Sequence, residues 1–165
     1  MLKNFSKESL WLPKNEQLHI TFAHVISPDS KYKIDRTKLW KDLHPEVKRA
    51  LEEITKKPLN IEVQFNELLS FQASIIVKGY DNGSYDKLRN KFIKLFNLPD
   101  ESRRPPNIIH ATVARFRNEL PFDNVKTVTD GIGVSFTDST QKLQLIHEEK
   151  IFVQSHSVIS SFPRE

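Results

Sequence analysis

Two His-x-Thr tripeptides are the feature of this sequence best suited to chemistry. The first, His19 to Thr21, lies in the run LHITFAHVI, and the second, His110 to Thr112, lies in IIHATVARFR. Both runs are typical of β-strands, in which successive side chains point to opposite faces, so each histidine shares a face with its threonine. Because the ordinary pKa of histidine is about 6.5, one imidazole can accept a proton and another can donate one at neutral pH.

If both pairs face one bound group, the four side chains suit phosphodiester chemistry. One imidazole would take a proton from the attacking water or hydroxyl, and the other would protonate the departing oxygen. The threonine hydroxyls would donate hydrogen bonds to the anionic oxygens as charge builds during the attack. Neither a metal nor a covalent nucleophile is required. Which histidine is the acid and which the base depends on the substrate, and the sequence leaves this open.

Two other interpretations of the tripeptides remain open. Both histidines could pack inside an ordinary structural or interaction domain, which is the usual role of a lone histidine among apolar neighbours. The chain could also be a non-catalytic nucleotide-binding or RNA-binding module that has the same cleft. Two copies, each at the head of a similar run of elements, favour catalysis, because binding alone does not require two titratable imidazoles.

The elements that must position the tripeptides follow from hydrophobic periodicity. Apolar residues three and four apart predict a helix over residues 34–56, broken or restarted at Pro45, and a second helix over 85–96. The second helix has four apolar or aromatic residues on one expected face, Tyr85, Leu88, Phe92 and Leu95. A short helical segment is expected at 121–132, and strands are expected at 18–26, 59–69, 71–80, 108–116, 133–137, 141–148 and 150–159.

This element order predicts an α+β fold in a single domain over residues 1–165. A β-α-β-β unit, a helix and a second β-α-β-β unit follow one another, and each unit opens with a His-x-Thr strand, which indicates a pseudo-twofold repeat. The lobes are expected to comprise roughly residues 1–80 with the strands of 133–165, and residues 81–132.

The two tripeptides resemble those of the 2H phosphoesterases, a family that includes the RNA 2′,3′-cyclic phosphodiesterases, historically called 2′-5′ RNA ligases. The run HATVAR is similar to the family's His-x-Thr-hydrophobic-x-Arg form, and HITFAHV matches its shorter first motif. The resemblance implies a bilobal α+β fold with two antiparallel sheets flanking a central cleft. It also implies that His19 and His110 are catalytic and that Thr21 and Thr112 bind phosphate.

The expected activity is a metal-independent phosphodiesterase that acts on a nucleotide or short oligonucleotide, RNA among them. The bond attacked would be a 2′,3′-cyclic phosphate, a 2′-5′ linkage or a linkage of a cyclic oligonucleotide. Substrate choice would lie in the loops at residues 28–35 and 99–107, where the sequence shows no recognisable code. No cofactor is expected, and we expect the protein to be a monomer.

Several further residues are candidates for substrate contacts. Arg115 occupies the arginine position of the second motif, yet strict alternation places it on the face opposite His110. Either a bulge or strand end turns it toward the site, or it forms a salt bridge elsewhere. Arg103 and Arg104 could steer a polyanion or simply lie in a solvated loop. Two loop aromatics near the first strand, Trp11 and Tyr32, are candidates for stacking on a base.

Other kinds of site find little support. The chain has no cysteine, which excludes thiolate chemistry and cysteine-bound zinc. Among the remaining histidines, alternation makes His24 structural, whereas His44, His147 and His156 lack the spacing of a metal site. No Gly-x-Ser-x-Gly or glycine-rich phosphate loop occurs among the four glycines.

Composition sets the broad class of the protein. The 165 residues include 38% hydrophobic and 28% charged residues, as in soluble globular proteins. The net charge of +4 favours anionic partners only weakly. No apolar run approaches the roughly 18 residues of a membrane-spanning helix. Because the N-terminal residues also lack the apolar core of a secretory signal, we expect a cytoplasmic location.

Overall fold

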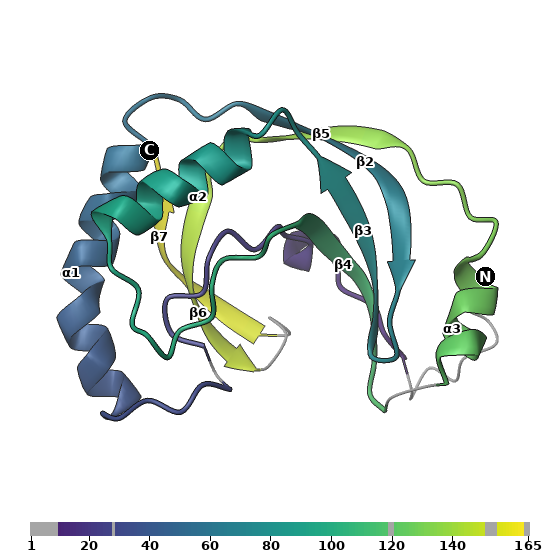
Figure 1. Ribbon diagram of the computed structural model, residues 1–165, viewed down its shortest axis with the longest axis horizontal. Coiled ribbons are helices and arrows are strands. Elements are labelled where there is room, and N and C mark those ends of the chain that lie inside the picture. The colour runs from purple at the N-terminus through teal and green to yellow at the C-terminus, as the bar shows by residue number, and fades with distance from the viewer. Residues whose placement is uncertain (1–9, 28, 119–120, 151–154, 164–165) are drawn as a thin grey trace. The chain divides into compact units, whose positions relative to one another are not determined.

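The computed structural model describes residues 10–27, 29–118, 121–150 and 155–163, and it has the expected mixed α+β composition (Figure 1). A curled antiparallel sheet of five strands has the order β1-β4-β3-β2-β5, and a second sheet pairs β6 with β7. Within the described ranges the elements are β1 (Leu10–Trp11), the short 3-10 helix η2 (Asn15–Gln17), α1 (Arg36–Ile54), β2 (Ile61–Ser70), β3 (Ser74–Tyr80), α2 (Ser84–Leu95), β4 (Ile109–Phe116), α3 (Phe122–Thr129), β5 (Phe136–Thr140), β6 (Leu143–Lys150) and β7 (Ser155–Phe162).

Helix α1 runs without interruption through Pro45, so the expected break there is wrong. The carboxylate of Asp35 accepts hydrogen bonds from the backbone N–H groups of Thr37 and Lys38 and begins the helix. Pro45 is exposed, and the buried side chains lie both before and after it on one face. Continuous packing of that face offsets the missing backbone hydrogen bond. The buried residues are Leu39, Val47, Ala50, Leu51 and Ile54.

Helix α2 forms where its periodicity predicts, but two of the four residues on its buried face differ from the expected ones. Leu95 is 40% exposed, whereas Phe96, directly after the helix, is buried. Arg89 takes a buried position in the middle of the face, at 3% exposure. The sequence interpretation did not include this residue in the expected face. The buried face therefore comprises Tyr85, Arg89, Phe92 and Phe96.

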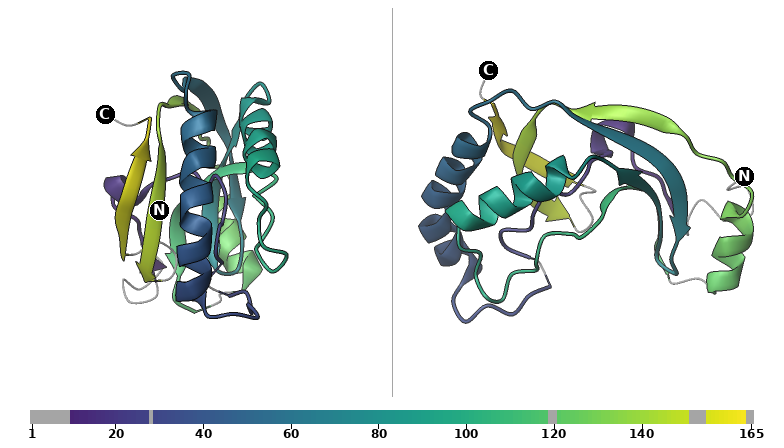
Figure 2. Two further views of the ribbon diagram at one scale, coloured as in Figure 1. Left: turned by 90° about the vertical axis from the view of Figure 1, so that its left-hand side faces the viewer. Right: turned by 45° about the horizontal axis from the view of Figure 1, so that its top comes forward.

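Helices α1 and α2 pack together beside the β6–β7 pair (Figures 1 and 2). In this sheet Leu143 lies opposite Phe162, and both are buried against the two helices. The sequence predicts both strands, although residues 151–154 of the expected last strand lie outside the described residues. The core of this part of the protein contains Val47, Ala50, Leu51, Ile54, Phe92, Phe96, Leu143, Leu145 and Phe162.

The five-stranded sheet has a second core on one of its faces. Val125 of α3 packs there with Ile75, Ala114 and Phe116. Gly79 lies on the same face, where a Cβ atom would meet the Cγ1 atom of Val63 at 2.5 Å. Side chains alternate between the two faces of a sheet. The residues between those packed on this face therefore point to the opposite face.

The expected strand over residues 18–26 is largely absent. Only Ile20 forms a β-bridge, and residues 22–27 are irregular. Side chains hold this backbone in place of a strand ladder: the Nε–H of Arg89 donates to the carbonyl of Phe22 at 3.1 Å, and the hydroxyl of Ser102 donates to that of Val25 at 2.7 Å. The edge of the sheet beside β4 is extended by β1, which the sequence did not predict.

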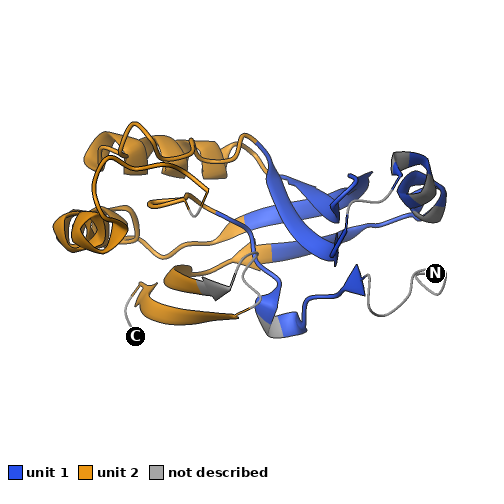
Figure 3. Ribbon diagram, turned by 90° about the horizontal axis from the view of Figure 1, so that it is seen from below, with its two compact units in different colours: residues 1–21, 62–80, 108–138 blue, residues 22–61, 81–107, 139–165 orange. Residues whose placement is uncertain are grey.

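The chain divides into two compact units, shown in blue and orange in Figure 3. Unit 1 contains residues 1–21, 62–80 and 108–138, and unit 2 contains 22–61, 81–107 and 139–165. These bounds differ from those of the expected lobes. The reason is strand pairing, because β4 joins β3 and β2 instead of forming a lobe with α2. Both His-x-Thr tripeptides consequently belong to unit 1.

Candidate functional site

The two tripeptides lie side by side in unit 1. Their central residues, Ile20 and Ala111, form an antiparallel β-bridge. In antiparallel pairing the residue before one partner lies opposite the residue after the other, so the neighbours of the bridge also face one another. Extending this pairing by one residue on each side of the isolated bridge puts His19 opposite Thr112 and Thr21 opposite His110.

By the alternation of antiparallel pairing, this extension puts all four side chains on one face of the sheet. Ile20 and Ala111 point to the other face, because side chains alternate along each chain. Directly opposite residues have Cβ atoms about 4.5–5.5 Å apart, and the diagonal pair of His19 and His110 is separated by roughly 7–8 Å. Two imidazoles at that separation could contact opposite sides of one phosphate group. We call these four residues, His19, Thr21, His110 and Thr112, the His-Thr quartet.

A β-bulge decides where Arg115 points. Across the β3–β4 ladder, Thr112 pairs with Ile76, whereas Ala114 pairs with Ile75 and Arg115 pairs with Ser74. Val113 is thus an extra residue in β4, and it reverses the alternation beyond it. Arg115 therefore lies on the face of the quartet. The sequence left a bulge, a strand end and an outside salt bridge open, and the register shows that a bulge is present.

Trp11 lies on the same face as Arg115, because β1 pairs it directly opposite that arginine. Trp11 is partly buried. Of the two candidates for base stacking, Trp11 is therefore the one that shares a sheet face with Arg115 and the quartet. Tyr32 belongs to unit 2, where its hydroxyl accepts a hydrogen bond from the backbone N–H of Ser27 at 2.7 Å and bonds the Ser102 hydroxyl at 3.2 Å.

The two loop arginines also belong to unit 2. The guanidinium of Arg103 forms an ion pair with Asp29, and its backbone N–H donates to the hydroxyl of Ser27 at 3.2 Å. Arg104 is exposed. The ion pair gives Arg103 a local structural role that the sequence interpretation did not foresee.

The ring of His19 is oriented by the backbone that precedes it. Its Nδ1 lies 2.7 Å from the carbonyl oxygen of Gln17, at the end of η2. A carbonyl oxygen only accepts hydrogen bonds, so Nδ1 carries the proton and donates it. Nε2 is therefore the ring nitrogen that this hydrogen bond does not engage, and the side chain is exposed to solvent. This arrangement suits a group that exchanges protons with a bound ligand.

Lys78 is a charged residue of this face that the sequence interpretation missed. It pairs directly opposite His110, on the side of β4 away from the first tripeptide. Its ammonium lies 3.2 Å from the carboxylate of Glu67 and 4.7 Å from the centre of the Tyr80 ring. The only signal in the sequence is a lysine that interrupts the apolar run SIIV of an otherwise buried strand.

The interactions of this cluster keep both charges in place. The Tyr80 hydroxyl donates a hydrogen bond to the Glu67 carboxylate, and this bond, together with Lys78, lowers the pKa of Glu67. Hydrogen bonds with Tyr80 and Glu67 raise the pKa of Lys78. The lysine therefore remains a cation at all physiological pH values.

The other histidines are not gathered into a site within the described residues. His24 is partly buried in the irregular segment after the first tripeptide, and His44 packs against Trp40 in α1 with ring centres 4.8 Å apart. His147 and His156 lie on β6 and β7. In the parts of the chain that the structure describes, no three histidine or acidic side chains converge as a metal site would require.

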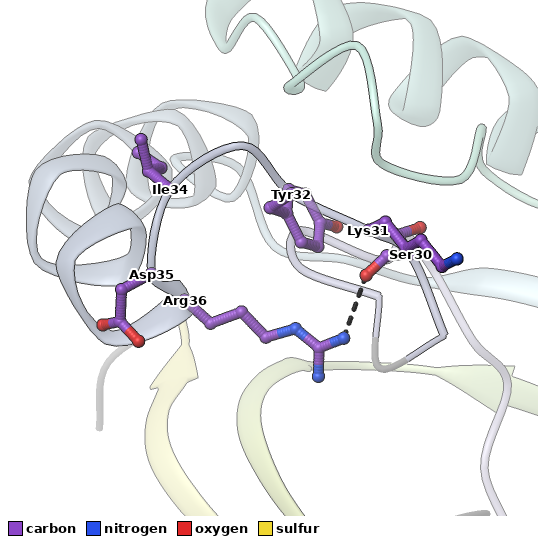
Figure 4. Close-up of a pocket in the computed structure, with 6 residues that line it drawn as sticks. All are labelled: Ser30, Lys31, Tyr32, Ile34, Asp35 and Arg36. Carbon is purple, nitrogen blue, oxygen red and sulfur yellow. Dashed lines mark hydrogen bonds between the residues drawn. The ribbon is translucent and has the colours of Figure 1, made fainter.

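A hollow of about 480 Å³ lies elsewhere, in unit 2 (Figure 4). Arg36 extends along it, donating a hydrogen bond to the carbonyl of Ser30 at 2.9 Å and lying over the ring of Tyr32. No residue of the His-Thr quartet lines it. Its lining residues are Ser30, Lys31, Tyr32, Ile34, Asp35 and Arg36.

Comparison with the models of known protein families and with the curated proteins finds no match to this chain. Within the described residues, no helix combines the length and the apolar character that crossing a membrane would require.

Proposed function

We propose that the protein is a metal-independent phosphodiesterase that acts on a nucleotide or short oligonucleotide through two-histidine acid-base catalysis. The observation that supports this proposal is the antiparallel bridge between Ile20 and Ala111. A packing role for the histidines does not require this juxtaposition, whereas acid-base catalysis on one phosphate does. The bilobal, pseudo-twofold arrangement with a central cleft remains a prediction of the 2H resemblance.

The proposed reaction is illustrated by the opening of a 2′,3′-cyclic phosphate. Water attacks phosphorus, and one imidazole takes the proton that this water loses. The bond between phosphorus and one ribose oxygen breaks, and the other imidazole gives that oxygen a proton. His19 would act through Nε2, because its Nδ1–H is held by the carbonyl of Gln17. The reaction leaves a phosphate monoester and a free ribose hydroxyl.

The remaining groups on this face would stabilise the charge of the transition state. Thr21 and Thr112 alternate with the two histidines at the corners of the quartet, where their hydroxyls can donate to phosphoryl oxygens. Arg115, which follows the bulge in β4, would add a planar guanidinium that can bind two phosphoryl oxygens at once. Trp11, opposite Arg115, would offer a ring to a nucleobase.

The test is a product-resolved screen of cyclic phosphates, 2′-5′ dinucleotides and cyclic oligonucleotides with the wild type, His19→Ala and His110→Ala. Loss of general acid-base catalysis is expected to lower turnover by about 10²–10⁴-fold in each variant. EDTA is expected to have no effect. His147→Ala is the matched control, since it removes an exposed histidine from a strand of the other sheet.

Full activity in both single variants would refute the assignment. Binding of nucleotides by calorimetry, without product from any substrate, would instead support the non-catalytic binding module.

A further inference from the structure

Four side chains form a row across the face of the quartet. The ladders pair His110 with Lys78 and Lys78 with Glu67, and extension of the Ile20–Ala111 bridge by one residue adds Thr21 beside His110. Neighbouring strands are about 4.8 Å apart, so Lys78 is one strand beyond His110, and Glu67 is two. The row therefore continues the site away from Thr21, and its third member is a cation.

The ammonium of Lys78 is held toward β2 and away from the quartet. It lies 3.2 Å from the carboxylate of Glu67, on the far side from His110. This contact places the positive charge roughly 5–10 Å beyond His110 along the row. At that distance the charge is better placed for a second anionic group than for the phosphate bracketed by the two imidazoles.

The ammonium also retains the capacity to bind a ligand. A lysine has three N–H donors, and the contacts with Glu67 and Tyr80 use two of them. The side chain is 26% exposed. Glu67 orients the lysine, but its own negative charge opposes the approach of an anion.

We propose that Lys78 forms a subsite for a second phosphate of the substrate, so that the protein prefers oligonucleotides and phosphorylated nucleotides to nucleotides with a single phosphate. This inference rests on the proposed function. The inference extends that function by defining the substrate as a molecule with a second phosphate next to the one that reacts.

The test compares two substrates that differ by one phosphate, adenosine 2′,3′-cyclic phosphate and its 5′-phosphorylated form. The wild type is expected to have about a fivefold higher kcat/KM for the phosphorylated substrate, as suits a partly exposed ion pair. The preference is expected to decrease as ionic strength rises, because salt screens exposed charges. Since both rates come from the same preparation, their ratio is independent of the fraction of folded protein.

Three variants separate a phosphate subsite from a purely structural ion pair. Lys78→Met is expected to bring the ratio of the two kcat/KM values near one, and Lys78→Arg to retain the preference. Glu67→Gln is expected to increase it, because the lysine remains and the repelling carboxylate is gone. The control is Lys91→Met, which breaks a lysine–glutamate pair between Lys91 of α2 and Glu53 of α1. It is expected to leave the ratio unchanged.

Calorimetry with adenosine 2′-monophosphate and adenosine 2′,5′-bisphosphate provides the same comparison without turnover. A wild type that binds or hydrolyses the two members of each pair equally would overturn the subsite and leave the proposed function standing. A preference that survives in Lys78→Met would also overturn it. A wild type that neither binds nor hydrolyses any of these compounds or any substrate of the product-resolved screen would overturn both proposals.

Discussion

Gly79 offers a quantitative test of the packing that sets the two faces of the large sheet. In Gly79→Ala, the new Cβ atom would lie 2.5 Å from Cγ1 of Val63, 3.0 Å from Cε1 of Phe65 and 3.2 Å from Cγ2 of Ile109. All three neighbours are buried apolar side chains with little room to move. Overpacking of this kind costs about 1–3 kcal/mol. The lower backbone entropy of alanine in the unfolded chain offsets about 0.4–1 kcal/mol of that cost.

The net expectation is a loss of about 1–2 kcal/mol in the free energy of unfolding, measured by urea denaturation. The corresponding decrease in Tm is roughly 2–8 °C for a chain of this size. Gly133→Ala is the control, because a Cβ atom there meets nothing within 4 Å.

A second substitution identifies the cause. Val63→Ala removes the atom that the new Cβ would strike, so the double variant is expected to be at least 0.5 kcal/mol more stable than additivity of the two single variants predicts. Additive effects, or a Gly79→Ala variant as stable as the wild type, would refute the packing described for this face and with it the argument for which residues face the site.

Three further predictions concern Arg89, Arg115 and Glu67. Arg89→Met is expected to lower the free energy of unfolding by about 1–3 kcal/mol, since Arg89 is buried and its Nε–H donates to the carbonyl of Phe22; thermal denaturation measures this. Arg115→Ala is expected to lower kcat/KM about 10–100-fold, whereas Arg117→Ala, which removes an exposed arginine after β4, is expected to leave it unchanged. The folded state lowers the pKa of Glu67 below its usual value of 4.5. The ionised Glu67 carboxylate therefore stabilises the fold above pH 4.5, and this stabilisation is lost as pH falls through the lower pKa of the folded state. Urea denaturation at a series of pH values should therefore show wild type and Glu67→Gln converging in acid, and a constant difference would contradict this.

Regular periodicity explains which parts of the fold could be predicted from the sequence. The long helix, α2 and strands β2 to β4 follow from apolar spacings that local geometry imposes on each element alone. Helix α1 continues through Pro45 because tertiary packing on one face outweighs a local signal. Residues 22–27 do not form a strand because their hydrogen bonds come from side chains distant in the sequence, such as Arg89 and Ser102. No local pattern contains that information.

For the candidate site, too, local sequence patterns could predict only part of the arrangement. The quartet could be proposed from two tripeptides, since alternation along one strand is a local property. The direction of Arg115 could not, because a bulge is defined only against the partner strand, here by the pairing of Ile75 and Ile76. Lys78 was missed for the same reason, since its relation to His110 exists only in the register between β3 and β4.

The pairing of Ile20 with Ala111 has a consequence for how the protein is made. The two residues are about ninety positions apart, and a ribosome adds roughly 5–20 residues per second, so the first tripeptide waits on the order of 5–18 s for its partner to be synthesised. During that interval the nascent chain carries one imidazole of the pair without the other. Until the second tripeptide leaves the ribosome and docks, a growing chain therefore cannot assemble the quartet.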